Sequence, residues 1–317
     1  MSDRQKIIID TDPGKDDAVA ILLALASPEI EVLGITAVAG NVPLELTQTN
    51  ARKICELAGR PFMKVFAGSA RPLCNQLETA EEVHGRDGLG GPDLPPPKMP
   101  LQDQHAVDFI IETISTHPAR SVTLCTLGPL TNIALALIRE PAIASRIRKI
   151  VMMGGGFFGG GNVTPAAEFN IYVDPHAAQL VCQSGVPIVM IPLDCTHQAV
   201  ATKARIAEIR ALGTEVAGAV GDLLDFVEYF DGKRTAGAGT PLHDPNVIAY
   251  ILRPDLYQGR DCNVEIETAS PLCMGMTVVD WWGTSGRPVN VHYVRNVDAD
   301  GFFSLLTERL GRLRPSA

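Results

Sequence analysis

Short apolar runs alternate with stretches of helical periodicity along most of the chain. Runs of strand length occur at residues 7–9, 31–38, 64–67, 121–126, 149–153 and 187–192. Between them, apolar residues recur with helical spacing from Asp16 onwards and then at 43–58, 106–115, 129–139 and 174–184. Strands and helices that alternate in this way form parallel sheets with right-handed crossovers. The three consecutive isoleucines at 7–9 fit a strand buried on both faces, which is typical of such a sheet.

Other segments depart from this alternation. Residues 68–100 are irregular and contain His84 among glycines, which fits either a lid over a ligand or a plain surface loop. Helical patterns at 202–212, 215–230, 245–251 and 299–313 surround a loop at 231–240 and strands at 262–268, 276–280 and 290–294. These late strands predict an antiparallel edge or flap. We therefore predict one α/β domain over residues 1–317, with a mixed, mainly parallel Rossmann-like sheet flanked by helices and a small antiparallel C-terminal flap.

Composition and charge narrow the class of protein. With 46% hydrophobic residues the chain can bury a sizeable core. A net charge of −9 and a pI near 5.3 argue against binding to nucleic acid or to anionic membranes by bulk attraction. The polar start shows no signal peptide, no apolar run is long enough for a membrane span, and the seven scattered cysteines fit reduced thiols. We expect a cytoplasmic protein.

Carboxylates gather where the first strand ends. Asp10, Asp12, Asp16 and Asp17 lie at the junction of this strand and the next helix. One interpretation is a turn followed by ordinary charges at a helix start. However, ligand sites in open α/β sheets lie beyond the carboxyl ends of strands, and acids this close together favour a bound cation. Oxygen ligands of this kind suit Ca²⁺ or Mg²⁺.

Two further groups of polar residues are candidates for a site. The glycine-rich run at 154–161 lacks the sequence of a phosphate loop, but Asn162, Glu168 and Asn170 follow it, either as ligand contacts or as solvated loop residues. His243 and Asp244 precede Pro245 at a helix start. There Asp244 can be a plain N-cap, a functional residue, or both.

Four motifs in this order resemble the nucleoside hydrolases, most closely the inosine-uridine-preferring kind. They are DTDPGKDDAVA at 10–20, LGPLTN at 127–132, MGGG…AEFN at 153–170 and LHDP at 242–245. The resemblance covers nearly the whole chain. It implies a Ca²⁺-dependent enzyme that cleaves the N-glycosidic bond of a small-molecule ribonucleoside and assembles as a homodimer or homotetramer.

The resemblance also implies a role for each matching residue. Calcium would be bound by the side chains of Asp12, Asp17 and Asp244 and by the backbone carbonyl of Leu127, with Asp10 supporting this site. Asp16 and Asn41 would hold the 2′- and 3′-hydroxyls and the attacking water. The 5′ side of the sugar would contact Asn162, Glu168, Asn170 and Met153. His243 would lie near the leaving base, although the run before Asn162 is one residue longer than in the family pattern.

The chemistry explains why such residues are needed. Cleavage of a ribosyl C–N bond develops positive charge on the sugar, which carboxylates stabilise. We expect Asp12 to act as the general base and His243 to protonate the departing base, with His84 as a second choice. Trp281 and Trp282 could stack on the base, but core packing fits at least one of them better.

Two other functions are compatible with parts of the pattern. The first strand also has the form of an aspartate-nucleophile, Mg²⁺-dependent phosphohydrolase, in which Asp10 would attack phosphate. No obvious phosphate clamp follows in the sequence, and the AEFN and LHDP motifs would have no role. The other alternative is a calcium-dependent ribonucleoside-binding protein without catalytic activity.

Overall fold

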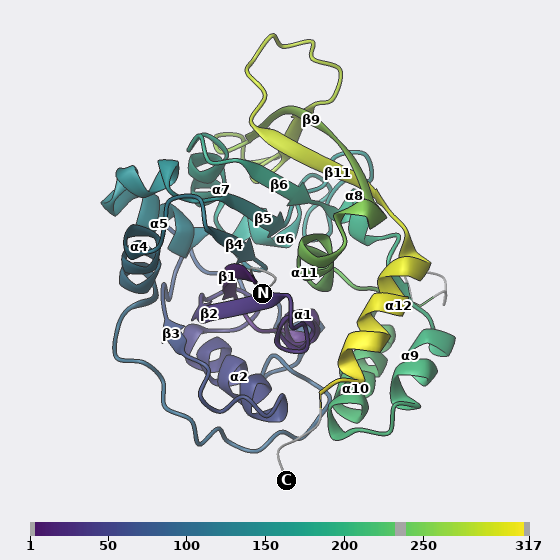
Figure 1. Ribbon diagram of the computed structural model, residues 1–317. Coiled ribbons are helices and arrows are strands. Elements are labelled where there is room, and N and C mark those ends of the chain that lie inside the picture. Colours follow the sequence, from purple (N-terminus) through teal and green to yellow (C-terminus); the bar gives the residue numbers. More distant parts are fainter. Residues whose placement is uncertain (1–3, 232–238, 314–317) are drawn as a thin grey trace.

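A nine-stranded sheet runs through the centre of the protein (Figure 1). The structure is a computed structural model that describes residues 4–231 and 239–313. In spatial order the strands are β10 (Thr277–Asp280), β9 (Tyr257–Ile266), β11 (Val291–Val297), β6 (Ile188–Ile191), β5 (Lys149–Met153), β4 (Val122–Thr126), β1 (Gln5–Thr11), β2 (Ile30–Ala37) and β3 (Val65–Ala67). A second, two-stranded sheet joins β7 (Val200–Ala201) to β8 (Thr240–Pro241).

Most of the large sheet is parallel. Neighbouring strands pair in parallel from β3 through β1 and β6 to β11. β9 then pairs antiparallel with β11, and β10 antiparallel with β9. The predicted mixed, mainly parallel sheet is confirmed, and so is its antiparallel edge. This edge is continuous with the main sheet because β11 pairs with both β6 and β9.

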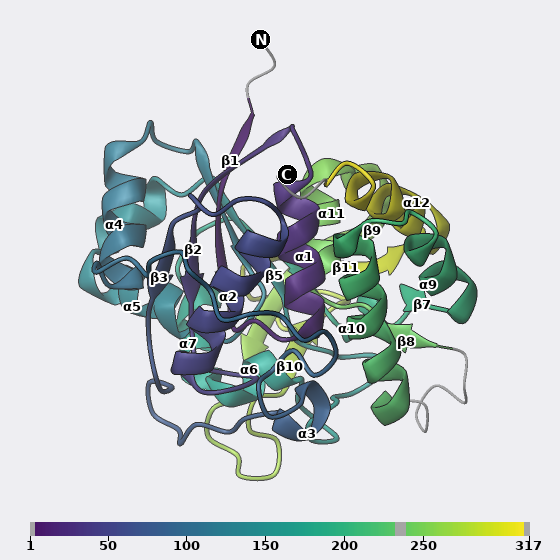
Figure 2. The ribbon, with the colours of Figure 1, turned by 90° about the horizontal axis from the view of Figure 1, so that it is seen from below.

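Helices cover both faces of this sheet (Figures 1 and 2). One face packs against α1 (Lys15–Leu25), α2 (Leu44–Leu57) and α11 (Pro245–Leu252). Outside these lie α9 (Lys203–Arg210), α10 (Glu215–Asp231) and α12 (Ala299–Leu310), of which α10 packs on α1 and α12 packs on α1 and α11. The other packs against α4 (Ala106–Thr116), α5 (Thr131–Arg139) and α7 (Pro175–Cys182). Ile7 and Ile9 of β1 belong to the first core and Ile8 to the second, as expected for a strand buried on both faces. None of the described helices has the length and apolar character needed to cross a membrane.

The main differences from the sequence prediction concern short or polar elements. β9 begins at Tyr257, before the expected strand at 262–268. The sequence did not reveal this start because residues 258–261 are polar and exposed and carry no apolar pattern. The helices α3 (Glu81–His84), α6 (Phe169–Val173) and α8 (Leu193–Thr196) were not predicted, since none is long enough to establish helical periodicity. Short 3₁₀ helices lie at Pro141–Ser145, after α5, and at Pro254–Leu256, after α11. Of the loop expected at 231–240, residues 232–238 lie outside the described part of the chain.

All seven cysteines are free thiols, as the sequence suggested. Cys55, Cys125, Cys182, Cys195 and Cys262 are buried, and only Cys74 is classed as exposed. Burial raises the pKa of the Cys55, Cys125 and Cys182 thiols to about 12. These side chains therefore behave as small apolar core residues rather than as reactive groups.

Candidate active site

A cavity of about 770 Å³ lies where the parallel strands end, and residues of α3 and α6 line it. These two helices are seen in the lower part of Figure 2. This is the edge of an open α/β sheet at which ligands bind. Ten of the residues singled out in the sequence line it: Asp16, Asn41, His84, Leu127, Met153, Asn162, Glu168, Asn170, His243 and Asp244. Asp10, Asp12 and Asp17 are fully buried beside these lining residues. The fold thus gathers the predicted residues from distant parts of the chain.

Asp12 occupies a narrow slot directly after β1. One carboxylate oxygen, Oδ2, accepts a hydrogen bond of 2.7 Å from the backbone N–H of Asn41. A Cβ added at Gly40 would lie 2.1 Å from Oδ2, and one added at Gly128 would lie 2.2 Å from Oδ1. Only glycine can occupy these two positions without displacing the carboxylate. The other oxygen, Oδ1, is buried and has no hydrogen-bond partner among the residues that the structure describes.

Asp16, Asp17 and Asp244 form a compact acidic group. Each offers a carboxylate oxygen, and the three oxygens lie within 4.8 Å of one another. Asp17 is held in place by the hydroxyl of Thr11, 2.5 Å from Oδ1, and by the backbone N–H of Gly14, 3.0 Å from Oδ2. The group brings the start of α1 together with the start of α11, which are separated by most of the sequence.

Burial and mutual repulsion make these acids hard to ionise without a counter-charge. Burial, followed by the charge of Asp17, raises the pKa of Asp12 well above its usual value. Burial and the charges of Asp16, Asp17 and Asp12 do the same to the pKa of Asp244. Burial and the charge of Asp16 raise the pKa of Asp17 to about 6.

The described residues at this point fit a hard divalent cation. The unpartnered Oδ1 of Asp12 and the acidic group provide oxygen ligands only, as Ca²⁺ and Mg²⁺ prefer. The backbone carbonyl of Leu127 is a further candidate, because Leu127 lines the cavity. This carbonyl also accepts a hydrogen bond of 2.7 Å from the side chain of Asn170.

Asp10 supports its neighbours rather than facing the cavity. Its Oδ1 accepts hydrogen bonds from the hydroxyl of Thr36 at 2.5 Å and from the side-chain amide of Asn132 at 2.8 Å. Asn132, the last residue of the LGPLTN motif, also bonds the carbonyl of Ala37. Asp10 is fully buried and does not line the cavity. The two hydrogen bonds to its Oδ1 suit a residue that supports the site.

Glu168 and Asn170 line the cavity at the start of α6 (Phe169–Val173). The Glu168 carboxylate accepts backbone N–H bonds from Gly155 at 2.9 Å and from Asn170 at 3.0 Å, so it caps the helix. Burial raises the pKa of Glu168 to about 7. The Asn170 side chain also bonds the carbonyl of Met153 at 3.3 Å, and thereby links the start of α6 to the end of β5.

Asn162 lies on the same side of the cavity, at the end of the glycine-rich run. Its side-chain carbonyl accepts a hydrogen bond of 2.9 Å from the backbone N–H of Phe169. Gly161 allows the close approach of this loop, since a Cβ there would lie 2.2 Å from the carbonyl oxygen of Ala167. The longer glycine run therefore still brings Asn162 to the cavity.

His243 lines the cavity immediately before Asp244. Its Nδ1 lies 2.7 Å from the hydroxyl of Thr196, the last residue of α8. The ring of His197 makes an edge contact with it at a centroid distance of 5.8 Å. Thr196 is fully buried, so it holds the imidazole at Nδ1 and leaves Nε2 for other contacts.

His84 reaches the cavity from α3, within the segment that was expected to be irregular. Its Nδ1 accepts a hydrogen bond of 3.3 Å from the backbone N–H of Lys15. Burial lowers the pKa of His84 to about 4, against the opposing charge of Asp16. His84 is therefore neutral near pH 7 and is suited to hydrogen bonding rather than to acid catalysis.

Sequence reasoning gave no site role to Lys15, Thr196 or His197, which the structure places at or beside the cavity. His197 and Lys15 line it, and Thr196 contacts His243. Thr196 and His197 follow the end of β6. The rule that ligands bind beyond the carboxyl ends of parallel strands, which identified Asp12, would therefore have identified them too. By contrast, Trp281 and Trp282 do not line the cavity: Trp281 packs against the core and Trp282 is 79% exposed.

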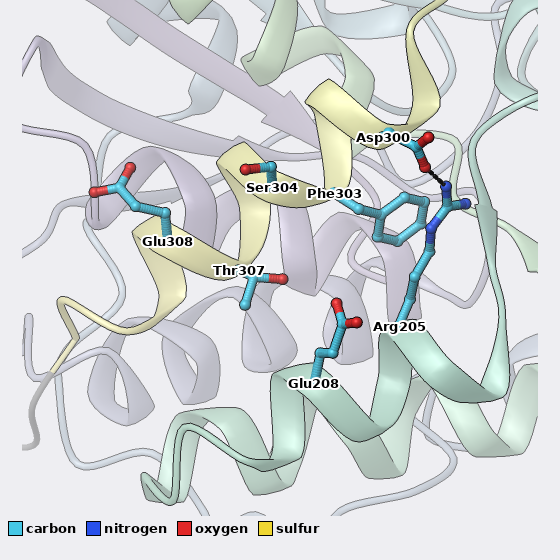
Figure 3. A pocket seen from close by; sticks show the side chains of 7 residues that line it. All are labelled: Arg205, Glu208, Asp300, Phe303, Ser304, Thr307 and Glu308. Atoms are coloured by element: carbon cyan, nitrogen blue, oxygen red, sulfur yellow. Dashed lines mark hydrogen bonds and ion pairs between the residues drawn. The ribbon is translucent and has the colours of Figure 1, made fainter.

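A second, smaller hollow lies on the surface between α9 and α12 (Figure 3). Its volume is about 460 Å³. The guanidinium of Arg205 crosses it, paired with Asp300 at 2.5 Å and positioned 4.3 Å from the ring centroid of Phe303. None of its lining residues also lines the larger cavity. We interpret this hollow as the seam between two surface helices.

Comparison with known proteins agrees with this geometry. The family described as inosine-uridine preferring nucleoside hydrolase matches residues 7–304. An uncharacterized protein of Schizosaccharomyces pombe is 54% identical over 97% of this chain and 99% of its own length. The pyrimidine-specific ribonucleoside hydrolase RihA of Salmonella agona is 45% identical over 96% of this chain and 97% of its own. The structure of a purine-preferring ribonucleoside hydrolase from Gardnerella vaginalis superimposes with a TM-score of 0.91 and 34% identity, covering 97% of this chain and 98% of that one. The chain therefore belongs to the inosine-uridine preferring nucleoside hydrolases, a family of ribonucleoside hydrolases.

Proposed function

We propose that this enzyme hydrolyses the N-glycosidic bond of ribonucleosides to ribose and free base in the cavity at the strand ends. The observation that carries the proposal is the arrangement around this cavity. The acidic group of Asp16, Asp17 and Asp244 meets Glu168, Asn170 and His243 at this cavity. Such a site can bind the sugar at the acids and release the base next to a proton donor.

A calcium ion is the proposed cofactor. Asp12, Asp17 and Asp244 would hold it through their side chains and Leu127 through its carbonyl, with Asp10 as the support behind them. Oxygen-only ligands and the unpartnered Oδ1 of Asp12 support a hard divalent cation at this position. When bound, the ion would supply positive charge that offsets the buried acids, orients the sugar diol and makes water more acidic.

The ribose would lie between the acids and α6. Asp16 and Asn41 would accept and donate hydrogen bonds at its 2′- and 3′-hydroxyls. Asn162, Glu168 and Asn170 would bind the 5′ side, with Met153 against the ring. Positive charge develops on the sugar as the C–N bond breaks. Carboxylates on two sides stabilise that charge where it forms.

Asp12 is the proposed general base. Its Oδ1 has no hydrogen-bond partner in the described residues, whereas its Oδ2 is fixed by Asn41. A carboxylate with one oxygen fixed and one available can take a proton from an attacking water without reorientation. Attack from the acidic side, opposite the leaving base, would invert the anomeric carbon.

His243 is the proposed donor to the leaving base. A purine or pyrimidine departs poorly as an anion, so a proton transferred from imidazole lowers the barrier. Thr196 fixes Nδ1 of His243, which leaves Nε2 to face the base. His84 would contact the substrate as a neutral hydrogen-bond donor, in agreement with its lowered pKa.

The test is a panel of ribonucleosides assayed for free base. The panel must include purine and pyrimidine ribonucleosides, because one similar protein is named a pyrimidine-specific hydrolase and another a purine-preferring one. We expect base release that stops with a calcium chelator and returns with added calcium. Release of phosphate from nucleotides without base release would favour the phosphohydrolase, and bound but intact nucleosides would indicate a binding protein. Light scattering on the same sample tests the proposed dimer or tetramer.

A further inference from the structure

The segment that carries His84 is fastened to the loops of the site at both ends. We call residues 80–87 the His84 segment. At its start, the backbone N–H of Ala80 donates to the carbonyl of Asn41 at 2.9 Å. At its end, the buried side chain of Asn50 donates to the carbonyl of Asp87 at 2.7 Å and to that of Pro13 at 3.1 Å. The segment is therefore tied to the loops that follow β1 and β2.

Lys15 makes the contact at the middle of this segment. It is the first residue of α1 and its side chain is almost completely buried, at 1% exposure. Its Nζ donates a hydrogen bond to the carbonyl of Val83, and its backbone N–H donates to Nδ1 of His84. Burial of an amine is costly unless the amine is hydrogen bonded. The contact with Val83 is therefore a substantial interaction between α1 and α3.

The contact with Lys15 also fixes the His84 ring. A backbone N–H can only donate, so Nδ1 of His84 must accept and the ring proton must be on Nε2. The ring packs against the bare backbone of Gly14, where an added Cβ would lie 2.5 Å from Nδ1. His84 thus has a defined orientation and a defined donor atom at the wall of the cavity.

We propose that Lys15 is a positioning residue that locks the His84 segment in place and so directs Nε2–H of His84 at the substrate. This inference rests on the proposed function in one respect, since it takes His84 to contact the ribonucleoside. The hydrogen bonds from Lys15 to the His84 segment are present in the protein without substrate. These contacts make the position of His84 depend on the same junction of β1 and α1 that carries Asp12, Asp16 and Asp17.

Hydrogen exchange tests the lock without any activity measurement. The amides of Val83 and His84 donate to the carbonyl of Ala80 and would exchange faster if the segment loosened. Full-length Lys15→Met keeps the aliphatic chain and removes the amine. We expect exchange in 81–87 to accelerate about tenfold, the size of one lost charged hydrogen bond. Lys64→Met makes the same change at an exposed lysine before β3 and should leave this segment unaffected. Unchanged exchange in Lys15→Met would overturn the proposal.

Kinetics then test whether Lys15 acts through His84. With a cleavable ribonucleoside, Lys15→Met should raise KM about tenfold and change kcat less. In a His84→Ala background the same substitution should have almost no further effect, because the group it positions is gone. If the increases in KM from Lys15→Met and His84→Ala multiplied in the double variant, Lys15 would not act through His84. If the wild type cleaved no ribonucleoside, the proposed function would fail. The exchange experiment would still show whether Lys15 holds the His84 segment in place. Should Lys15→Met not fold, the shorter Lys15→Gln carries the same expectations.

Discussion

The hydroxyl of Thr196 lies 2.7 Å from Nδ1 of His243, where the end of α8 meets the residues just before α11. This contact joins a short helix to the proposed proton donor. Because Thr196 is fully buried, its hydroxyl is not free to rotate away into solvent. The orientation of the imidazole in the cavity therefore depends on a residue that does not line the cavity itself.

Removal of this hydroxyl should impair the protonation of the leaving base. Thr196→Val keeps the shape of the side chain and leaves Nδ1 of His243 without its partner. We expect kcat/KM for inosine or uridine to fall about tenfold, which corresponds to one hydrogen bond. Thr196→Ser retains the hydroxyl and should keep most of the activity. Equal losses in the two variants would mean that packing, not the hydrogen bond, is what matters at this position.

Loss of the imidazole itself should depend strongly on the leaving group. His243→Ala should reduce cleavage of inosine and uridine by about 10²- to 10⁴-fold, the usual size of general-acid assistance. A riboside with an activated leaving group, such as p-nitrophenyl riboside, needs no proton and should lose far less. Steady-state kinetics on the three substrates make the comparison. Similar losses on all of them would remove His243 from the role of acid.

The slot around Asp12 should tolerate no side chain at Gly128. In Gly128→Ala the new methyl would lie 2.2 Å from Oδ1 of Asp12, so the carboxylate must move. A displacement of this size typically costs about 100-fold in rate. Gly218→Ala is the matched control, because no atom lies within 4 Å of a Cβ at that position in α10. It should retain activity and gain about 0.5–1 kcal/mol of stability from helix propensity. A fully active Gly128→Ala enzyme would contradict the assigned role of Asp12.

The buried carboxyl group of Glu168 should make stability depend on pH. Burial raises its pKa from 4.5 to about 7 in the folded protein, whereas the unfolded chain keeps the lower value. Between pH 4.5 and pH 7 the folded protein therefore keeps Glu168 protonated, while the unfolded chain releases this proton. The resulting contribution to the free energy of unfolding, on the order of 3 kcal/mol at low pH, is lost as the pH rises through 7.

Glu168→Gln cannot ionise, so its unfolding free energy should fall less than that of the wild type between pH 5 and pH 8. Urea unfolding at the two pH values measures the difference between the proteins, independently of any constant loss from the altered helix cap. Parallel pH profiles for the variant and the wild type would show that Glu168 does not titrate in this range.

The sequence predicted the parallel part of the fold because apolar runs of strand length have few alternatives. Ile7 to Ile9 show this most clearly, with side chains in both cores. The acids after β1 could be selected for the same reason, since the end of a buried parallel strand is a known location for ligands. Asp244 was joined to them only by the resemblance of the motifs, because nothing local distinguishes it from a helix cap.

The features that the sequence did not predict depend on contacts between distant segments. Lys15 at the start of a helix would be solvated if the His84 segment did not cover it, and no pattern near residue 15 indicates this cover. Thr196 belongs to a helix of four residues, which is too short for any periodicity. The exposed polar start of β9 likewise becomes a strand only because β11 pairs with it.

Calcium binding tests the central claim most directly. Isothermal titration of calcium into chelator-treated protein should give one ion per chain in the wild type. Asp244→Asn removes one carboxylate of the acidic group and should lose calcium binding and ribonucleoside hydrolysis together, whereas Asp93→Asn, at an exposed aspartate, should lose neither. Full hydrolysis by wild-type protein that binds no calcium, with Asp244→Asn equally active, would contradict the account.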